Sequence, residues 1–331
     1  MTENTGINRR RLMAGAGLAA IATPFVSGAT SAMAQNTEGD RMKMVDAPPS
    51  DSFDLGDFKL LVVEDGTRLM ENPGETFGTG QDPETVAALL EENFLPPDRL
   101  VNGFAPVLVD TGNETVLFDT GMGPAGRSWG AGRLREGLIA NGYQPEDIDI
   151  VVITHMHGDH INGLMEEDGP AFPNARYVFG EKEYAFWSDD ARMGTPAEGG
   201  HQSVTKLVTP LVDQATFIGG GDEVVPGITA MDAFGHTPGH LIFMLESSDE
   251  RLLLTADTAN QYVLSLQRPD WHVRFDMDKE MAAATRRQVF DMVAAERIPF
   301  LGYHMPFPAV GYVEKVGDGY KFMPKTYQFK V

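Results

Sequence analysis

Three of the eight histidines in this chain lie within six positions, in the segment "THMHGDH" of residues 154–160. The apolar run "VVI" precedes the segment, which indicates that a buried strand ends where the histidines begin. His155 and His157 share one side of an extended chain, so both imidazoles can reach one ion. After the glycine bend, Asp159 and His160 can reach a second ion. Imidazole nitrogen and carboxylate oxygen suit Zn²⁺ and similar divalent metals, so the spacing predicts a metal site.

Four side chains cannot fill two coordination shells, so further ligands must come from other parts of the chain. The candidates follow apolar strands, as His155 does; they are His236 or His240 in "GHTPGH", Asp257 in "LTAD" and His304 in "LGYH". We expect these strand ends to converge on one edge of a sheet sandwich. The chain has no cysteine, which excludes disulfides, thiolate ligands and a cysteine nucleophile.

Length and charge narrow the class of protein further. With 331 residues and 42% hydrophobic composition, the chain can bury a large core, as one domain or as two packed halves. Its 48 acidic and 26 basic residues give a formal charge of −22. Such a surface repels phosphate backbones and anionic lipids, so we expect neither nucleic acid nor a membrane surface as a partner.

The N-terminal residues 1–34 have the pattern of an export signal. The arginine run Arg9–Arg11 precedes a moderately apolar, Ala/Gly-rich stretch that ends in Ala32–Ala34, a small-x-small cleavage pattern. Consecutive arginines favour a twin-arginine signal over an ordinary secretory signal, and the short, glycine-rich run argues against a membrane anchor. We therefore predict a periplasmic or secreted protein, cut near Ala34, with a polar linker over residues 35–52.

Patterning predicts alternating strands and helices that position the candidate ligands. Alternation and apolar runs predict strands, and helical periodicity with caps at Asp82 and Gly142 predicts helices. The predicted strands cover residues 58–67, 104–122 (a hairpin turning at Gly112 and Asn113), 148–154, 227–236, 251–260 and 299–304, and the predicted helices cover 82–94, 132–143 and 278–298. Both halves contain a strand that runs into an Asp-Thr pair, at 119–120 and 257–258, a repetition that an internal duplication or chance would produce.

The motifs "HMHGDH", "GHTPGH", "TAD" and "GYH", in this order, resemble those of the metallo-β-lactamase superfamily. The resemblance covers nearly the whole mature chain and implies an α/β protein, an αβ/βα four-layer sandwich over residues 53–331. It implies a two-metal site, most readily Zn²⁺, at the edge where the loops of the two sheets meet. Transferred to this sequence, His155, His157 and His236 hold one ion, Asp159, His160 and His304 hold the other, Asp257 bridges both, and His240 supports them from outside.

Within the superfamily, the chain looks most like the methyl-parathion-hydrolase-like and lactonase-like branch. The segments "AFPNA", "EYAFW" and "HMPFPAVGYVEKVGDGYKF" carry this resemblance, and the missing cysteine excludes β-lactamases with a cysteine ligand. One position departs from the pattern. N-acyl-homoserine lactonases commonly place a tyrosine three residues after the bridging aspartate, where this chain has Asn260, and Tyr262 is out of register.

The metals imply the chemistry. Two cations that share Asp257 and a solvent molecule lower the pKa of that water, so a hydroxide can attack a carbonyl or phosphoryl centre. We expect Asp159 and Asp257 to be catalytic, with Asp159 orienting the hydroxide or passing a proton to the leaving group. The sequence thus predicts an exported metal-dependent hydrolase of neutral lactones or aryl esters. A phosphotriesterase and a non-catalytic, metal-loaded binding module are the alternatives, and the oligomeric state stays open, a homodimer included.

Aromatic residues are the candidates for the wall of a substrate pocket. These are Trp187 and Phe186 in "EYAFW" and Trp129 in "GRSWGAGR". The alternative is that each is a packing aromatic. The segment 260–276 after Asp257 is a loop that could close over the site and bring Trp271 and His272 near the substrate. His201 and His272 lie in polar segments, where solvated side chains are the alternative to a functional role.

Overall fold

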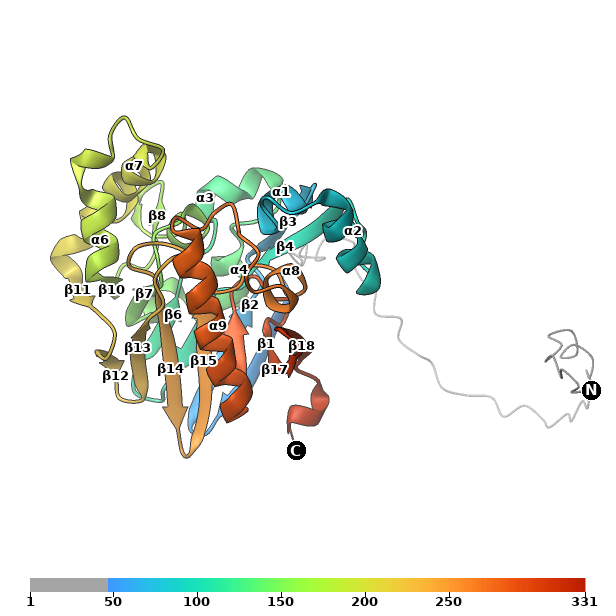
Figure 1. The fold of residues 1–331 in the computed structure, drawn as a ribbon. Helices are drawn as coiled ribbons and strands as arrows, with labels where there is room; N and C mark the ends of the chain where they lie inside the picture. Colours follow the sequence, from blue (N-terminus) through green and yellow to red (C-terminus); the bar gives the residue numbers. More distant parts are fainter. Residues whose placement is uncertain (1–46, 331) are drawn as a thin grey trace, which may run out of the picture. The chain divides into compact units, whose positions relative to one another are not determined.

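The computed structural model describes residues 47–330. The predicted signal and most of the predicted linker lie outside this range. Two sheets form the centre of the described domain, as predicted (Figure 1), and each sheet has seven strands. The first sheet contains, in spatial order, β1 (Ser50–Leu55), β2 (Phe58–Val63), β5 (Val107–Asp110), β6 (Thr115–Phe118), β7 (Ile150–Ile153), β10 (Arg176–Gly180) and β11 (Ala215–Ile218). The second contains β12 (Glu223–Val225), β13 (Ile228–Asp232), β14 (Leu241–Ser247), β15 (Glu250–Ala256), β16 (Phe300–Gly302), β17 (Val310–Val316) and β18 (Gly319–Pro324).

The inner strands of the first sheet are covered on both faces, and successive side chains of each strand point to opposite sides. In β7, Ile150 and Val152 join the core between the two sheets. Val151 and Ile153 face the other way, toward the helices on the outer face. These outer helices are α4 (Leu134–Ala140), α6 (Glu181–Ser188) and α7 (Glu198–Leu207). The uninterrupted apolar run that predicted a buried strand therefore serves two layers at once.

The long helix α9 (Lys279–Glu296) covers the outer face of the second sheet (Figure 1). Phe290 of α9 packs edge-on against Phe300 of β16, with ring centroids 5.2 Å apart. The order helix, sheet, sheet, helix is the four-layer αβ/βα sandwich that the sequence predicted. None of the helices in residues 47–330 combines the length and apolarity needed to span a bilayer.

A small module stands beside the sandwich at the end where the ligand loops lie. It contains the two-stranded sheet of β3 (Gly66–Glu71) and β4 (Arg99–Phe104) with α1 (Gly74–Phe77) and α2 (Pro83–Glu92). Asp82 caps α2 by accepting a hydrogen bond from the N–H of Glu84, and Pro83 is its first residue, as predicted. The shorter elements are β8 (Met165–Glu166), β9 (Gly169–Pro170), α3 (Gly123–Gly126), α5 (Gly158–Ile161), α8 (Leu264–Gln267), and the 3-10 turns η1 (Arg127–Trp129), η2 (Pro145–Asp147), η3 (Asp190–Arg192), η4 (Thr209–Gln214) and η5 (Tyr327–Lys330).

Two local expectations were wrong. Residues 50–52, which we placed in the linker, belong to strand β1, which pairs antiparallel with β2 from Ser50↔Val63 to Leu55↔Phe58. Their polar character reflects an edge strand whose alternate side chains face solvent. His201 does not lie in a solvated loop; it is buried on α7, and its Nδ1 lies 2.8 Å from the carbonyl oxygen of Trp187. The hairpin of β5 and β6 turns at Gly112, as predicted.

Candidate metal centre

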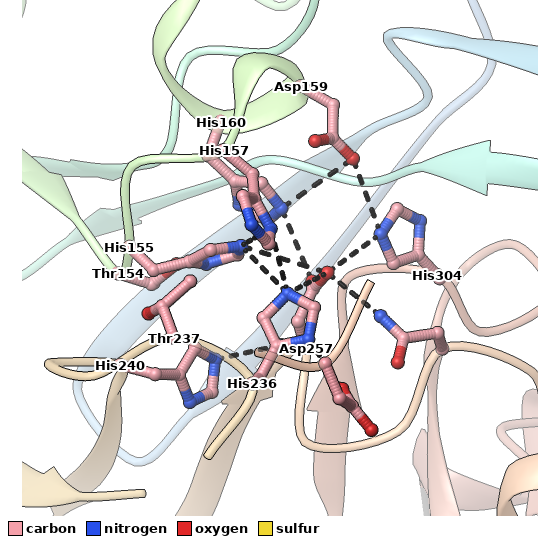
Figure 2. Close-up of polar contacts among 12 residues, drawn as sticks. Thr154, His155, His157, Asp159, His160, His236, Thr237, His240, Asp257 and His304 are labelled. Carbon is pink, nitrogen blue, oxygen red and sulfur yellow. Dashed lines mark hydrogen bonds and ion pairs between the residues drawn. The ribbon is translucent and has the colours of Figure 1, made fainter. Parts of the chain in front are cut away.

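The candidate ligands follow four strands that end on the same side of the sandwich. His155 and His157 come directly after β7, and α5 then presents Asp159 and His160. The others leave the second sheet: His236 follows β13, Asp257 follows β15 and His304 follows β16. Their side chains point toward one another around Asp257 (Figure 2). The predicted convergence of strand ends at one sheet edge is confirmed.

The first cluster, here called the three-histidine group, consists of His155, His157, His236 and Asp257. His157 Nδ1 lies 3.1 Å from His155 Nε2 and 2.9 Å from His236 Nε2, and the last two atoms are 3.2 Å apart. Asp257 Oδ2 is 3.3 Å from His236 Nε2. Ligand atoms held roughly 2.0–2.1 Å from one tetrahedral zinc ion lie about 3.3 Å from each other. The nitrogen triangle thus has the size of one face of a metal coordination shell.

The second cluster, here called the mixed group, consists of Asp159, His160 and His304. His304 Nε2 lies 3.4 Å from Asp159 Oδ2 and 3.2 Å from Asp257 Oδ2. His160 Nε2 lies 3.2 Å from Asp257 Oδ1. Asp257 therefore presents one or both oxygens to each group, which is the geometry that a bridging carboxylate needs.

Unsatisfied polar atoms test whether the residues fit cations. His160 Nε2 and Asp257 Oδ1 are buried, and although they lie 3.2 Å apart, neither makes a hydrogen bond among the described residues. A buried polar atom without a partner costs roughly 1–3 kcal/mol, so folded proteins rarely leave one at such a place. A divalent cation bound here would satisfy both atoms, because an imidazole nitrogen and a carboxylate oxygen are both metal-ligand atoms. The donor set fits two metal ions.

The ring nitrogens that face away from the centre have their own partners. His160 Nδ1 lies 2.8 Å from Asp119 Oδ2, and His236 Nδ1 lies 2.8 Å from Asp276 Oδ1. His304 Nδ1 lies 2.8 Å from the carbonyl oxygen of Gly103. In each case the partner can accept the Nδ1–H, which orients the ring so that Nε2 faces the centre.

Electrostatics in the centre follow from burial and from the clustered carboxylates. Burial lowers the pKa of His155 well below its usual value, and burial with the neighbouring His236 lowers the pKa of His157 to about 3, so both rings are neutral metal-binding imidazoles. Burial opposes protonation of His304 as well, but Asp257 and Asp159 raise its pKa to about 10. The negative charge of these carboxylates stabilises a proton on His304, and it would stabilise a bound divalent cation in the same way.

Asp119, Asp276 and Asn260 are site residues that the sequence analysis missed. Asp119 follows β6 with φ +61° and accepts hydrogen bonds from the N–H and hydroxyl of Thr154 besides its contact with His160. Its signal was present in the repeated Asp-Thr pairs, which we took for a trace of duplication. Asn260 donates from Nδ2 to Asp257 Oδ2 at 2.9 Å. Asp276 had no local signal, because its contact with His236 joins residues 40 apart in sequence.

A cavity of about 230 Å³, here called the central pocket, opens beside the mixed group. Asp159, Asp257 and His304 form its polar end. The side chains that line the rest are mostly apolar; they are Met70, Phe77, Phe104, Met122, Trp129 and Phe275, with Arg68, Asn102, Asn162 and Asn260. The small β3–β4 module, which the sequence did not connect with the site, supplies one whole wall.

Of the five predicted pocket residues, Trp129 lines the central pocket and the other four do not. Trp187 is 4% exposed, its indole N–H bonds to Glu183 at 2.7 Å, and its ring meets His157 edge-on with centroids 6.1 Å apart. Phe186 packs beside Trp187 and under the guanidinium of Arg192. Trp187 and Phe186 lie in the helical layer outside the first sheet. From there, Trp187 packs against the loop that carries His157.

The segment 260–276 contributes to the pocket differently from the expectation. Trp271 is buried against the α1–α2 module, and His272 forms an isolated bridge with Thr79 there. Asn260 and Phe275, at the two ends of the segment, line the pocket instead. The buried Arg286 of α9 fixes the segment, since it donates to the carbonyl oxygens of Thr258 and Pro269.

Comparison with known proteins agrees with this architecture. The family model described as "Metallo-beta-lactamase superfamily" matches residues 105–300. An N-acyl homoserine lactonase of Bacillus cereus is 27% identical over 233 residues, covering 63% of this chain and 84% of the relative. A lactonase of Bacillus sp is 27% identical over 212 residues, covering 60% and 76%.

Solved structures share the fold. The dizinc quorum-quenching lactonase AidC superposes with a TM-score of 0.78 at 23% identity, covering 85% of this chain and 99% of its own. The hydrolase AbOPH gives 0.77 at 24% identity, with 85% and 98% covered. Fold, ligand groups and relatives together define a metal-dependent hydrolase. The chain belongs to the metallo-β-lactamase superfamily, and the predicted superfamily and enzyme class are confirmed.

Proposed function

We propose that this protein is an exported, dinuclear zinc hydrolase whose preferred substrates are small neutral lactones with an apolar substituent. Carboxylic aryl esters are the second substrate class of the proposal. The observation that carries it is the central pocket, where six apolar side chains face a polar end made by Asp159, Asp257 and His304. Its volume of about 230 Å³ lies below the roughly 300–1,000 Å³ of most ligand pockets, which suits a small ligand.

The chain's residues divide the work in this proposal. When bound, a pair of divalent cations lowers the pKa of the water between them and polarises the oxygen of the scissile bond. Asp257 and the histidines hold these charges in place. Asp159 reaches the pocket with a side chain that is 23% exposed, so it can orient the attacking oxygen or hand a proton to the leaving alkoxide.

Charge and shape explain the preference for neutral substrates. A formal charge of −22 repels polyanions at long range, which disfavours phosphodiesters. The pocket wall is built from Phe104, Trp129 and Phe77, which offer apolar contact to an acyl chain. The naming of curated relatives as N-acyl homoserine lactonases supports a lactone, although Asn260 stands where the resemblance leads us to expect a tyrosine.

A substrate panel tests the proposal. Protein loaded with zinc is assayed against an alkyl γ-lactone, an N-acyl homoserine lactone, a p-nitrophenyl ester, a paraoxon-type phosphotriester and a cephalosporin. We expect the highest kcat/KM with one of the two lactones, loss of turnover after chelation, and recovery after zinc is returned. A preference for the phosphotriester instead makes the protein an organophosphate hydrolase, and absence of turnover on every substrate makes it a metal-loaded binding module.

The export part of the proposal has its own test. The arginine run and the pattern at Ala32–Ala34 support it. Full-length protein and an Arg10→Lys, Arg11→Lys variant are expressed, and the periplasmic fraction is analysed by N-terminal sequencing. We expect mature protein that begins at Gln35 from the parent, and cytoplasmic, uncut protein from the variant. Equal export of both would point to an ordinary secretory signal.

A further inference from the structure

Glu183 on α6 is a buried carboxylate that lies outside both metal-ligand groups. Its side chain is 1% exposed, and four donors surround it. Oε1 accepts hydrogen bonds from the backbone N–H of Met156 at 2.9 Å and from the indole N–H of Trp187 at 2.7 Å. Oε2 accepts from the hydroxyl of Thr237 at 2.7 Å and from the N–H of Gly239 at 2.9 Å. Both oxygens therefore act purely as acceptors.

These donors belong to the two loops that carry the three-histidine group. Met156 lies between His155 and His157, and Thr237 follows His236 directly. Figure 2 shows Thr237 beside the converging histidines. One side chain thus ties together two loops that come from different sheets and are about 80 residues apart, as the contact of His236 with His155 shows.

The contact between α6 and the second loop is close as well. A Cβ added at Gly239 would lie 2.2 Å from the backbone nitrogen of Glu183 and 2.6 Å from its Cα. Residue 239 must be glycine for the loop to lie directly on the first turn of α6. The backbone of Glu183 is therefore packed directly against the loop at Gly239. This packing fixes the position from which its side chain accepts hydrogen bonds.

The mixed group is supported by other residues. Asp119 accepts from His160, and the carbonyl of Gly103 accepts from His304. None of the hydrogen bonds of Glu183 reaches Asp159, His160 or His304 or their supporting residues. A change at Glu183 should consequently act on one ion and leave the other in place.

We propose that Glu183 is a positioning residue that sets the metal affinity of the three-histidine group. This proposal rests on the part of the proposed function that assigns two metal ions to the site, and it is independent of the substrate. Supporting residues of this kind typically change metal affinity about 10–100-fold when mutated. In Glu183→Gln, one oxygen becomes an NH₂ group that opposes two donors, so two of the four hydrogen bonds are lost and the two loops separate.

The test measures metal binding. Glu183→Gln and the matched control Glu181→Gln, an exposed position on the same helix, are titrated with a chromogenic zinc chelator. Metal content is measured in parallel. We expect about 10–100-fold weaker binding of one of the two ions in Glu183→Gln, and parent-like binding of both in Glu181→Gln. With Co²⁺ in place of zinc, the visible absorption of one bound equivalent should change in Glu183→Gln.

A milder variant guards against misfolding. Thr237→Val removes one donor with little change of shape, and we expect it to weaken the same ion by a smaller factor. The metal-free Tm of each variant is measured alongside. The proposal is overturned if Glu183→Gln binds both ions as tightly as the parent, or if both ions weaken equally. Because no substrate is used, a wrong substrate class would leave this result unaffected.

Discussion

The Nε2 atom of His240 accepts a hydrogen bond from the backbone N–H of Asp257, 3.1 Å away. On the other side of the ring, Nδ1 donates to the carbonyl oxygen of Ala233 at 3.0 Å. Burial lowers the pKa of His240 to about 3, so the ring is neutral, and the N–H of Asp257 that donates to Nε2 sets its tautomer. Both nitrogens are engaged, so His240 holds the backbone of the predicted bridging residue and His236 joins the three-histidine group.

Replacing each histidine of "GHTPGH" in turn should show which one is a metal ligand and which one only supports the backbone of Asp257. We expect His236→Ala to lose about one metal ion per chain. His240→Ala should keep two ions but lose roughly 1–3 kcal/mol of stability, because the N–H of Asp257 is left buried without a partner. Metal analysis and chemical denaturation measure the two effects. Loss of an ion from His240→Ala, with His236→Ala fully loaded, would invert the assignment.

Asp257→Asn should weaken both ions, since Asp257 Oδ1 faces His160 while Oδ2 faces His236 and His304. An amide carries no charge and offers one metal-binding oxygen in place of two. The exposed Asp213→Asn is the control. Metal content after dialysis against a weak chelator is the measurement. Retention of one tightly bound ion in Asp257→Asn would show that the carboxylate serves a single ion.

Trp129, rather than Trp187, should affect turnover of apolar substrates. Trp129 lies edge-on to Phe104, 6.1 Å between centroids, and lines the central pocket. We expect Trp129→Ala to lower kcat/KM for an alkyl lactone by about fivefold or more, equivalent to roughly 1 kcal/mol, mainly through KM. Phe186→Leu, which lies away from the pocket, should stay within about twofold. Steady-state kinetics would contradict this assignment if the order were reversed.

Arg68 carries the one guanidinium among the described residues that line the central pocket. It stacks 6.0 Å from the Trp129 ring, and in the described chain it makes no ion pair. Its N–H groups can donate to a substrate carbonyl away from the scissile bond, such as the amide of an N-acyl homoserine lactone. We expect Arg68→Gln to lower kcat/KM about fivefold for an N-acyl homoserine lactone and under twofold for an alkyl lactone. Arg99→Gln, on the neighbouring strand, is the control. If Arg68→Gln lowers kcat/KM equally for both lactones, Arg68 does not contact the acyl carbonyl.

Arg286 should matter for stability. It is buried, it pairs with Asp276 at 2.9 Å, and Asp276 in turn contacts His236. Arg286→Met leaves Asp276 buried without its cation, at a cost of about 3–5 kcal/mol. Arg287→Met removes a partly exposed ion pair with Asp270 and should cost about 0–1 kcal/mol. Thermal unfolding measures the difference, and equal Tm values for the two variants would contradict it.

Much of the fold was predictable because its signals are local. The cap at Asp82, the hairpin turn at Gly112 and the apolar run of β7 each specify a conformation through neighbours a few residues away. The first half of β1 was missed, since residues 50–52 of this edge strand are polar and carry no apolar signal. His201 was misplaced for a related reason, because its burial depends on a contact with Trp187, 14 residues earlier.

The sequence by itself determined the family, the sandwich and the seven candidate ligands. The spacing of the "HMHGDH" motif and the position of each later ligand after an apolar strand are readable without coordinates. Tertiary structure alone decided what surrounds them. Asp119, Asp276 and Glu183 meet the ligand loops across 27 to 56 residues, and one wall of the pocket comes from the separate β3–β4 module. Such contacts depend on how layers pack, and no local pattern encodes that packing.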